Sequence, residues 1–387
     1  MVENEVNQIS FVDSSDIICL SHLRWDFVYQ RPQHLLSRFA RGVRVFFFEE
    51  PIFSDEPTRL DINRRKDNLY VAVPKIAHLD RESRNVTDIQ REMLDELVDS
   101  NSIKDFVLWF YTPMAMDFAD RLKPAATVFD CMDELSAFKF APPELVENER
   151  RLMEKADVVF TGGQSLYEAK SDRHANIHAF PSSIETEHFN QARNITDEPV
   201  DQASIPHPRF GFCGVIDERM DIEMLREMAE LRPEWQFVMI GPIVKIAEED
   251  LPRHENIHYL GGKDYKDLPA YIAGWDVAIM PFAINESTKF ISPTKTPEYL
   301  AAGKSVVSTP IRDVVRPYGD LGLVHIASTA KEFVAACEIA LKDDESDRLQ
   351  KTDEFLSYNS WDITFNKMKS LIDEAVIKQG KAVANTV

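Results

Sequence analysis

The sequence predicts an α/β protein in which two doubly wound units face a central cleft. Short apolar runs alternate with longer stretches whose apolar residues recur three and four positions apart, the spacing of a helix face. This alternation is typical of mostly parallel sheets covered by helices. One aperiodic segment, 181–208, separates two such series, and 387 residues suffice for two domains. Two sheets joined by one linker predict a cleft between them.

The first series of strands and helices fills the N-terminal half. Apolar runs mark the strands, and apolar periodicity, with proline near the first helix start, marks the helices. Strands are expected at 16–20, 43–48, 69–73, 106–110, 126–130, 157–161 and 176–180. Helices are expected at 31–40, 88–99 and 142–155.

The second series follows the linker and shows the same alternation. Strands are expected at 209–213, 236–240, 257–260, 277–281, 305–309 and 323–326, and helices at 331–341 and 360–378. We therefore expect an N-terminal domain at 1–185, a linker at 186–208, a C-terminal domain at 209–355 and a final region, 356–387, whose helix packs back on the N-terminal domain.

Charge and cysteine content exclude several classes of protein. Lys+Arg 44 against Asp+Glu 65 gives a net charge of -21, which disfavours nucleic acid as a partner. Cys19, Cys131, Cys213 and Cys337 are far apart in apolar segments and predict buried thiols. Residues 1–10 lack a signal-peptide pattern, and no apolar stretch reaches the roughly 18 residues of a membrane span. We expect a cytoplasmic protein, with attachment at the inner face of the membrane left open.

An aromatic and charged loop follows the first strand. It contains His22, Arg24, Trp25 and Asp26 and lacks the glycines of a dinucleotide fingerprint. Such a loop lies at the carboxyl edge of the sheet, where open α/β proteins bind ligands. Two other interpretations stay open: the aromatic residues pack as an interface plug between domains, or Asp26 caps the helix that starts near Arg31.

Residues 286–309 predict a loop, a short helix and a buried strand. Thr296 is a candidate N-cap, and Pro297 fits the first helical position. Free amides at the helix start would bind an anion, with Lys295 adding a full charge and Glu298 accepting hydrogen bonds. The alternative is a capped connection in which Glu298 serves only the helix dipole.

Four ordered motifs resemble those of a known enzyme class. Segment 293–309, PTKTPEYLAAGKSVVST, is similar to the donor-site segment of retaining family 4 glycosyltransferases. Segments 25–34, 129–134 and 214–221 are similar to a bacterial subgroup that includes teichuronic-acid and other exopolysaccharide glycosyltransferases. The resemblance covers nearly the whole chain. It implies the GT-B fold, two Rossmann-like domains that hold the nucleotide-sugar donor mainly in the second and the acceptor mainly in the first.

The resemblance also implies roles for single residues. Glu298 matches the second glutamate of the family's Glu, seven residues, Glu motif, which binds the ribose hydroxyls, and Lys295 and Arg219 match basic positions near the diphosphate. The implied donor-binding residues are Gly214, Arg219, Gly241, Lys263, Thr294, Lys295 and Glu298. The implied catalytic residues are Asp26, Asp133, Arg219 and Lys295, and the implied acceptor-binding residues are His22, Arg24, Trp25 and Arg31.

One position departs from this motif. The first glutamate should stand eight positions before Glu298, where this sequence has Phe290. The loop is therefore expected to meet the sugar through Thr288, Lys289 or Thr294, and the departure puts retaining stereochemistry in doubt.

The implied reaction transfers a sugar from a UDP- or GDP-linked donor to a glycan or lipid-linked acceptor in polysaccharide synthesis, with no cofactor or metal. An inverting reaction would need a base, for which Asp26, His22 and Asp133 are candidates. Polysaccharide assembly proteins are the expected protein partners. Two alternatives are a sugar-nucleotide epimerase of the same fold and a non-catalytic binding partner in an assembly complex.

Overall fold

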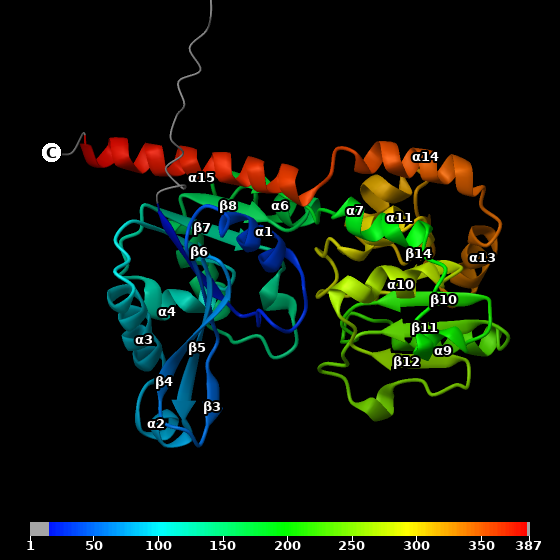
Figure 1. Cartoon of the computed structure of the whole chain (residues 1–387), viewed down its shortest axis with the longest axis horizontal. Helices are drawn as coiled ribbons and strands as arrows, with labels where there is room; N and C mark the ends of the chain where they lie inside the picture. Colours follow the sequence, from blue (N-terminus) through cyan, green and yellow to red (C-terminus); the bar gives the residue numbers. More distant parts are fainter. Residues whose placement is uncertain (1–14, 385–387) are drawn as a thin grey trace, which may run out of the picture.

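The computed structural model describes residues 15–384, which form two units, each built on its own sheet (Figure 1). Residues 1–10, in which the sequence shows no signal-peptide pattern, and the end of the tail, 385–387, lie outside the described residues. None of the helices in the described range combines the length and apolar content that a bilayer crossing requires.

The N-terminal sheet contains every strand expected before the linker. Its path runs β3-β5-β2-β1-β6-β7-β8-β9, with β4 paired to β5. Pairing is parallel throughout the path, and its central strands are buried, which explains their continuous apolar runs. The strands are β1 (Asp16–Ser21), β2 (Val45–Glu49), β3 (Ile52–Ser54), β4 (Arg59–Lys66), β5 (Leu69–Ala77), β6 (Phe106–Phe110), β7 (Ala126–Cys131), β8 (Val158–Thr161) and β9 (Ile177–Ala179).

Strands β3 and β4 were not predicted from the sequence. Strand β4 reads RLDINRRK and is mostly exposed, because it pairs antiparallel with β5 at the outside of the sheet. A polar strand lacks the apolar run or strict alternation that marks buried strands. The β4–β5 hairpin projects away from the rest of the sheet (Figure 1).

The C-terminal sheet is parallel, with the order β12-β11-β10-β13-β14-β15. Every expected strand is present. They are β10 (Arg209–Cys213), β11 (Gln236–Ile240), β12 (Ile257–Gly261), β13 (Val277–Met280), β14 (Ser305–Ser308) and β15 (His325–Ile326). The strand order reverses between β10 and β13, which is where doubly wound sheets open a crevice.

Helices cover both sheets, and all of the predicted ones are present. Those of the N-terminal unit are α1 (Arg31–Phe39), α2 (His78–Ser83), α3 (Val86–Ser100), α4 (Met116–Ala119), α5 (Leu145–Lys155) and α6 (Gln164–Lys170). The later ones are α7 (Thr186–Phe189), α8 (Val200–Ala203), α9 (Ile222–Leu231), α10 (Leu268–Ala273), α11 (Lys295–Ala301), α12 (Arg312–Val314), α13 (Ala330–Ala340), α14 (Glu345–Leu356) and α15 (Trp361–Ala384).

The start of α11 corrects one expectation. The helix begins at Lys295 with Thr294 as its N-cap, so Thr296 is not the cap and Pro297 is the third helical residue. Thr296 is instead fully buried, and its hydroxyl donates to the sulfur of Met280. A buried partner far along the chain has overridden the local capping preference.

The last helix returns to the N-terminal unit. Trp361, Met368 and Ile372 of α15 are buried in the same apolar cluster as strands β1, β2 and β7. The ring of Trp361 stacks on His34 of α1, with centroids 4.5 Å apart. Helix α15 thus lies across the N-terminal sheet, although it follows the C-terminal unit in sequence (Figure 1).

Candidate active site

A pocket of about 730 Å³ lies between the two units, at the carboxyl ends of their strands. We call it the cleft pocket. Its N-terminal wall is the loop that follows β1, and its C-terminal wall is made by the loops after β10, β11 and β12 and by the start of α11. The predicted site residues that line it are Trp25, Asp26, Gly214, Gly241, Lys263 and Lys295.

Two glycine turns form part of the C-terminal wall. Gly241 has a φ of +145°, and a Cβ atom at this position would lie 1.7 Å from the carbonyl oxygen of Gly214. The N–H of Gly214 in turn donates to the carbonyl of Ile240 at 2.8 Å. The two turns therefore touch each other, and only glycine at 241 permits that contact.

Lys295 and Glu298 form an ion pair at the start of α11. The ammonium of Lys295 lies 2.8 Å from Oε2 of Glu298, whose residue is only 5% exposed. Burial lowers the pKa of Lys295, but the adjacent carboxylate more than offsets this effect and the pKa is raised. The lysine therefore stays charged at neutral pH. The neighbouring Tyr299 accepts a 2.7 Å hydrogen bond from the N–H of Cys213, which fixes α11 against the end of β10.

Lys263 lines the cleft pocket but is already paired. Its Nζ atom lies 2.6 Å from the carboxylate of Asp201 in α8. The hydroxyl of Tyr271 donates to the other oxygen of Asp201 at 2.8 Å. The loop that carries Lys263, an expected donor-binding residue, is thus attached to the linker.

Arg219 is held by a bidentate pair with Asp217. The Nε–Oδ1 and Nη2–Oδ2 distances are 2.9 and 2.6 Å. The guanidinium also lies 5.7 Å from the ring centroid of Phe138, on the opposite unit. Arg219 is not among the residues that line the cleft pocket, so a contact with a diphosphate there requires its guanidinium to move.

Asp133 follows β7 and is influenced by charges of the C-terminal unit. Burial raises the pKa of its carboxyl group to about 6, with a smaller upward contribution from Asp217 and an opposing one from Arg219. The carboxylate therefore gains its charge near neutral pH. Such a group is suited to accept a proton.

His22 follows β1. Burial lowers the pKa of its imidazole to about 4, and Lys245 of the opposite unit lowers it further, against a hydrogen bond with the backbone of Tyr111. Among the described residues, its Nδ1 atom has no hydrogen-bond partner. The ring is therefore neutral at physiological pH and has one free acceptor nitrogen.

Arg24 and Trp25 hold their loop against the end of β2. The guanidinium of Arg24 lies 2.9 Å from Glu49, and the N–H of Trp25 donates to the other carboxylate oxygen at 2.8 Å. The Trp25 ring packs edge-on against Phe47. Both residues therefore hold the loop in place. Of the two, only Trp25 lines the cleft pocket.

Asp26 is exposed and does not cap α1. The cap is Gln30, which forms a reciprocal capping box with Gln33. Asp26 instead forms a 2.7 Å ion pair with Arg65 of β4. The structure thus rules out the capping interpretation and leaves Asp26 facing the cleft pocket.

The structure contradicts the expected acceptor role of Arg31. Its residue is 4% exposed, and its guanidinium is 3.0 Å from both oxygens of the fully buried Asp130. It also donates to the carbonyl of Phe180 at 2.8 Å. An arginine enclosed in this way links α1, β7 and the residue that follows β9, and it is not available to a ligand.

Comparison with known proteins agrees with this geometry. Residues 207–343 match the family model described as glycosyl transferases group 1. The matched residues make up most of the C-terminal unit. TuaH of Bacillus subtilis (strain 168), named as a teichuronic acid biosynthesis glycosyltransferase, is 24% identical over 267 residues, which are 64% of this chain and 67% of TuaH.

Solved structures of two sugar-phosphate synthases share the fold over nearly the whole chain. An α,α-trehalose 6-phosphate synthase from Burkholderia multivorans aligns with a TM-score of 0.65 at 14% identity, over 96% of this chain and 98% of its own. A sucrose-phosphate synthase from Thermosynechococcus elongatus aligns with a TM-score of 0.67 at 14% identity, over 93% and 98%. The predictions of the GT-B fold and of a glycosyltransferase are confirmed.

Phe290, the departure from the glycosyltransferase motif, has a structural partner. Its ring packs against the apolar cluster of the N-terminal unit, whereas the neighbouring Ile291 belongs to the cluster of its own unit. The carbonyl of Ser292 accepts a 2.7 Å hydrogen bond from Ser182. The loop that would carry the first glutamate is therefore docked on the opposite unit.

Tyr265 is a cleft-pocket residue that the sequence did not single out. Its ring stacks on Tyr29 of the N-terminal unit at 4.6 Å and on His188 of α7 at 4.5 Å. Its hydroxyl donates to Glu185 at 3.2 Å. The sequence feature that could have identified Tyr265 as a site residue is its position shortly after Gly262 and Lys263.

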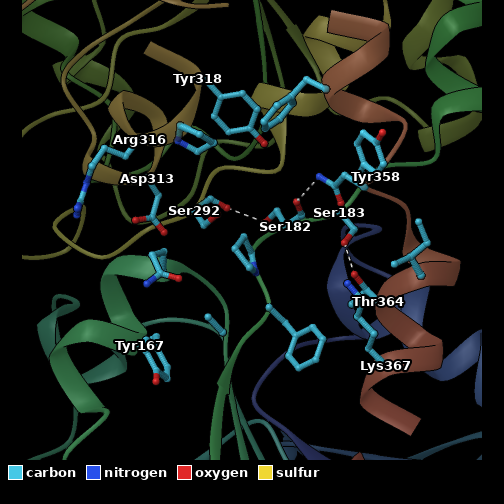
Figure 2. Close-up of a pocket in the computed structure, with 18 of the residues that line it drawn as sticks. Tyr167, Ser182, Ser183, Ser292, Asp313, Arg316, Tyr318, Tyr358, Thr364 and Lys367 are labelled. Carbon is cyan, nitrogen blue, oxygen red and sulfur yellow. Dashed lines mark hydrogen bonds between the residues drawn. The ribbon is translucent and has the colours of Figure 1, made fainter. Parts of the chain in front are cut away.

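A larger cavity, of about 1200 Å³, lies beside the linker and is shown in Figure 2. We call it the hinge cavity. Ser182, Ser183 and Ser292 line it, and the hydrogen bonds drawn there join the segment after β9 to the loop of Ser292 and to Thr364 of α15. Its wall includes side chains of both units and of α14 and α15.

Proposed function

We propose that this chain transfers a sugar from a UDP- or GDP-linked donor to a glycan or lipid-linked acceptor in the synthesis of a cell-surface polysaccharide. The observation that carries the proposal is the charged, largely buried Lys295–Glu298 pair at the start of α11, with Lys295 lining a cleft pocket whose C-terminal wall contains two touching glycine turns. These features lie in the glycosyl transferases group 1 domain. The name of TuaH supports the polysaccharide as product.

The proposed chemistry follows from where the charges lie. The acceptor hydroxyl attacks the anomeric carbon while the bond from that carbon to the donor diphosphate breaks. Lys295 stabilises the negative charge that develops on the leaving diphosphate, because this residue lines the cleft pocket and its ammonium remains protonated. Glu298 accepts hydrogen bonds from the ribose hydroxyls, as its place in the motif implies.

We propose that the anomeric configuration is retained and that no metal takes part. In that case an oxygen of the leaving diphosphate accepts the acceptor's proton. In an inverting reaction the proton would go to a protein base: the carboxylate of Asp133, which is ionised above about pH 6, or the free nitrogen of His22, whose imidazole is neutral above about pH 4. NMR of the product linkage decides between the two outcomes, and activity in excess EDTA tests the metal.

The first test is a panel of nucleotides. One of UDP, GDP and ADP at about a hundred times its Kd is expected to raise the Tm by roughly 5–10 °C, because it binds only the folded state. Glu298→Ala should abolish the rise, whereas Glu286→Ala, at a 78% exposed side chain nearby, should keep it. A flat response to all three nucleotides would refute the donor site.

A second assay separates transfer from its alternatives. The protein is incubated with labelled sugar nucleotides, with and without an oligosaccharide acceptor. A transferase forms labelled glycan only with acceptor, an epimerase converts the donor without it, and a binding partner leaves the donor unchanged.

A further inference from the structure

A smaller pocket, of about 400 Å³, opens on the N-terminal unit next to the cleft pocket and shares Asp26 and Phe27 with it. We call it the arm pocket, because one of its walls is the β4–β5 hairpin. Asn63 pairs with Val71 and Asp61 with Val73 in the antiparallel register. Alternate residues of a strand share a face, so these residues and Lys75 line the same side of the hairpin.

Most of the charged groups in the arm pocket are already neutralised. Arg24 is paired with Glu49, and Arg65 with Asp26. Asp61 is paired with Arg59, 2.7 Å away. In the range 15–384, by contrast, the ammonium of Lys75 and the amide of Asn63 have no ion-pair or hydrogen-bond partner. The pocket therefore has one spare cation and one spare amide.

An exposed aromatic ring borders these two groups. Phe27 lines the same pocket and is 55% exposed, although phenylalanine is usually buried. A pyranose ring has an apolar C–H face that packs on an aromatic ring and hydroxyl edges that bond to an amide. Ring, amide and ammonium together match a sugar that carries a negative group.

The local charge of the hairpin supports an anionic ligand. Strand β4 has basic residues at four of its eight positions, against one acidic residue, in a chain whose net charge is -21. An acidic protein repels anionic ligands except where cations gather. This hairpin is such a place, and it adjoins the cleft.

We propose that the arm pocket binds a negatively charged sugar unit of the acceptor, bearing a carboxylate or a phosphate. Lys75 binds the anionic group, Asn63 the hydroxyls and Phe27 the apolar face of the ring. The proposal rests on the proposed function, because the shared wall at Asp26 and Phe27 leads the next unit of the acceptor into the cleft pocket.

Calorimetric titration of the full chain tests this site with three probes: trigalacturonic acid, neutral maltotriose and glucose 1-phosphate. Trigalacturonic acid should bind at least tenfold more tightly than maltotriose. Lys75→Gln should remove most of that preference, a loss of about tenfold, because a hydrogen bond to a charged group is lost. Lys66→Gln is the matched control: it removes the same charge from an exposed site on the same hairpin, outside the pocket, and should change affinity less than twofold.

The outcomes are distinguishable. Binding of glucose 1-phosphate alone, lost in Lys75→Gln, supports the site with phosphate as its anionic group. Equal affinity for acidic and neutral saccharides, or equal losses in the two lysine variants, would overturn it. The proposal would also be overturned if the Lys75→Gln variant still bound the acidic sugar and the Glu298→Ala variant did not. Lys75-dependent binding together with a flat nucleotide response would leave the subsite standing and refute the transferase.

Discussion

Asp133 shows how a single ionisable residue connects the two units. It lies after β7 in the N-terminal unit, yet Arg219 and Asp217 of the other unit influence the charge of its carboxyl group. Burial dominates and raises the pKa to about 6, compared with about 3.9 for an unfolded aspartate. The folded state thus holds this proton more tightly than the unfolded state does.

The raised pKa of Asp133 predicts a pH-dependent cost to stability. Stability that is present below about pH 4 is lost as the pH rises through 6, because the folded chain must then carry a poorly solvated charge. Asp133→Asn should therefore raise the free energy of unfolding by about 1–3 kcal/mol at pH 7.5 and leave it unchanged at pH 4. Urea unfolding at both pH values measures this.

The control for Asp133 is Asp67→Asn, at a 94% exposed carboxylate. It should not change the free energy of unfolding by more than about 0.5 kcal/mol at either pH. A destabilised Asp133→Asn at pH 7.5 would contradict the assigned desolvation cost.

At the scale of elements, the sequence predicted buried strands well and exposed ones poorly. Strand β13 is apolar and buried, so its pattern identified it, whereas the polar β4 depends on β5 for its hydrogen bonds. Single residues followed the same rule. The Lys295–Glu298 pair joins neighbours in one helix, so the local sequence predicts it. The partner of Arg31 is Asp130, 99 positions away, and no local sequence pattern predicts such a distant pair.

In the loop 286–294, the residue at position 290 explains where the loop lies in the structure. A glutamate at 290 could not pack against the apolar cluster of the N-terminal unit without losing its hydration, whereas phenylalanine gains by that burial. The departure from the family motif therefore fixes the loop to the opposite wall of the cleft.

Removing the Phe290 ring should release this loop. Phe290→Ala is expected to lower the free energy of unfolding by about 1–2 kcal/mol, less than for a fully buried ring, and to speed amide hydrogen exchange across 286–294. Ile284→Ala, at a 62% exposed residue just before this loop, should do neither. Unchanged exchange in Phe290→Ala would show that the loop is held by other contacts.

At the scale of the whole molecule, the two units are joined by contacts on the linker side of the cleft. Asp313 of α12 reaches across to α6, where it accepts a 2.9 Å hydrogen bond from the N–H of Ser165. The N-cap of α6, Gly163, offers no side chain for this purpose. A Cβ atom on Gly163 would lie 2.3 Å from the Asp313 carboxylate, so a residue of one unit caps a helix of the other.

Loss of this cap across the interface should affect both helix α6 and the angle between the two units. Asp313→Ala leaves the first turn of α6 without its acceptor, at a cost of about 0.5–2 kcal/mol, and also removes one of the contacts that fix the angle between the units. The radius of gyration from small-angle X-ray scattering should therefore rise without nucleotide, and a bound nucleotide should reverse part of the rise, since ligand contacts from both walls favour the closed arrangement. Asp320→Ala, at an exposed position in the same segment, should leave the scattering unchanged. If both variants scatter like the unaltered chain, the remaining contacts, such as the Ser182–Ser292 hydrogen bond, suffice to set the angle.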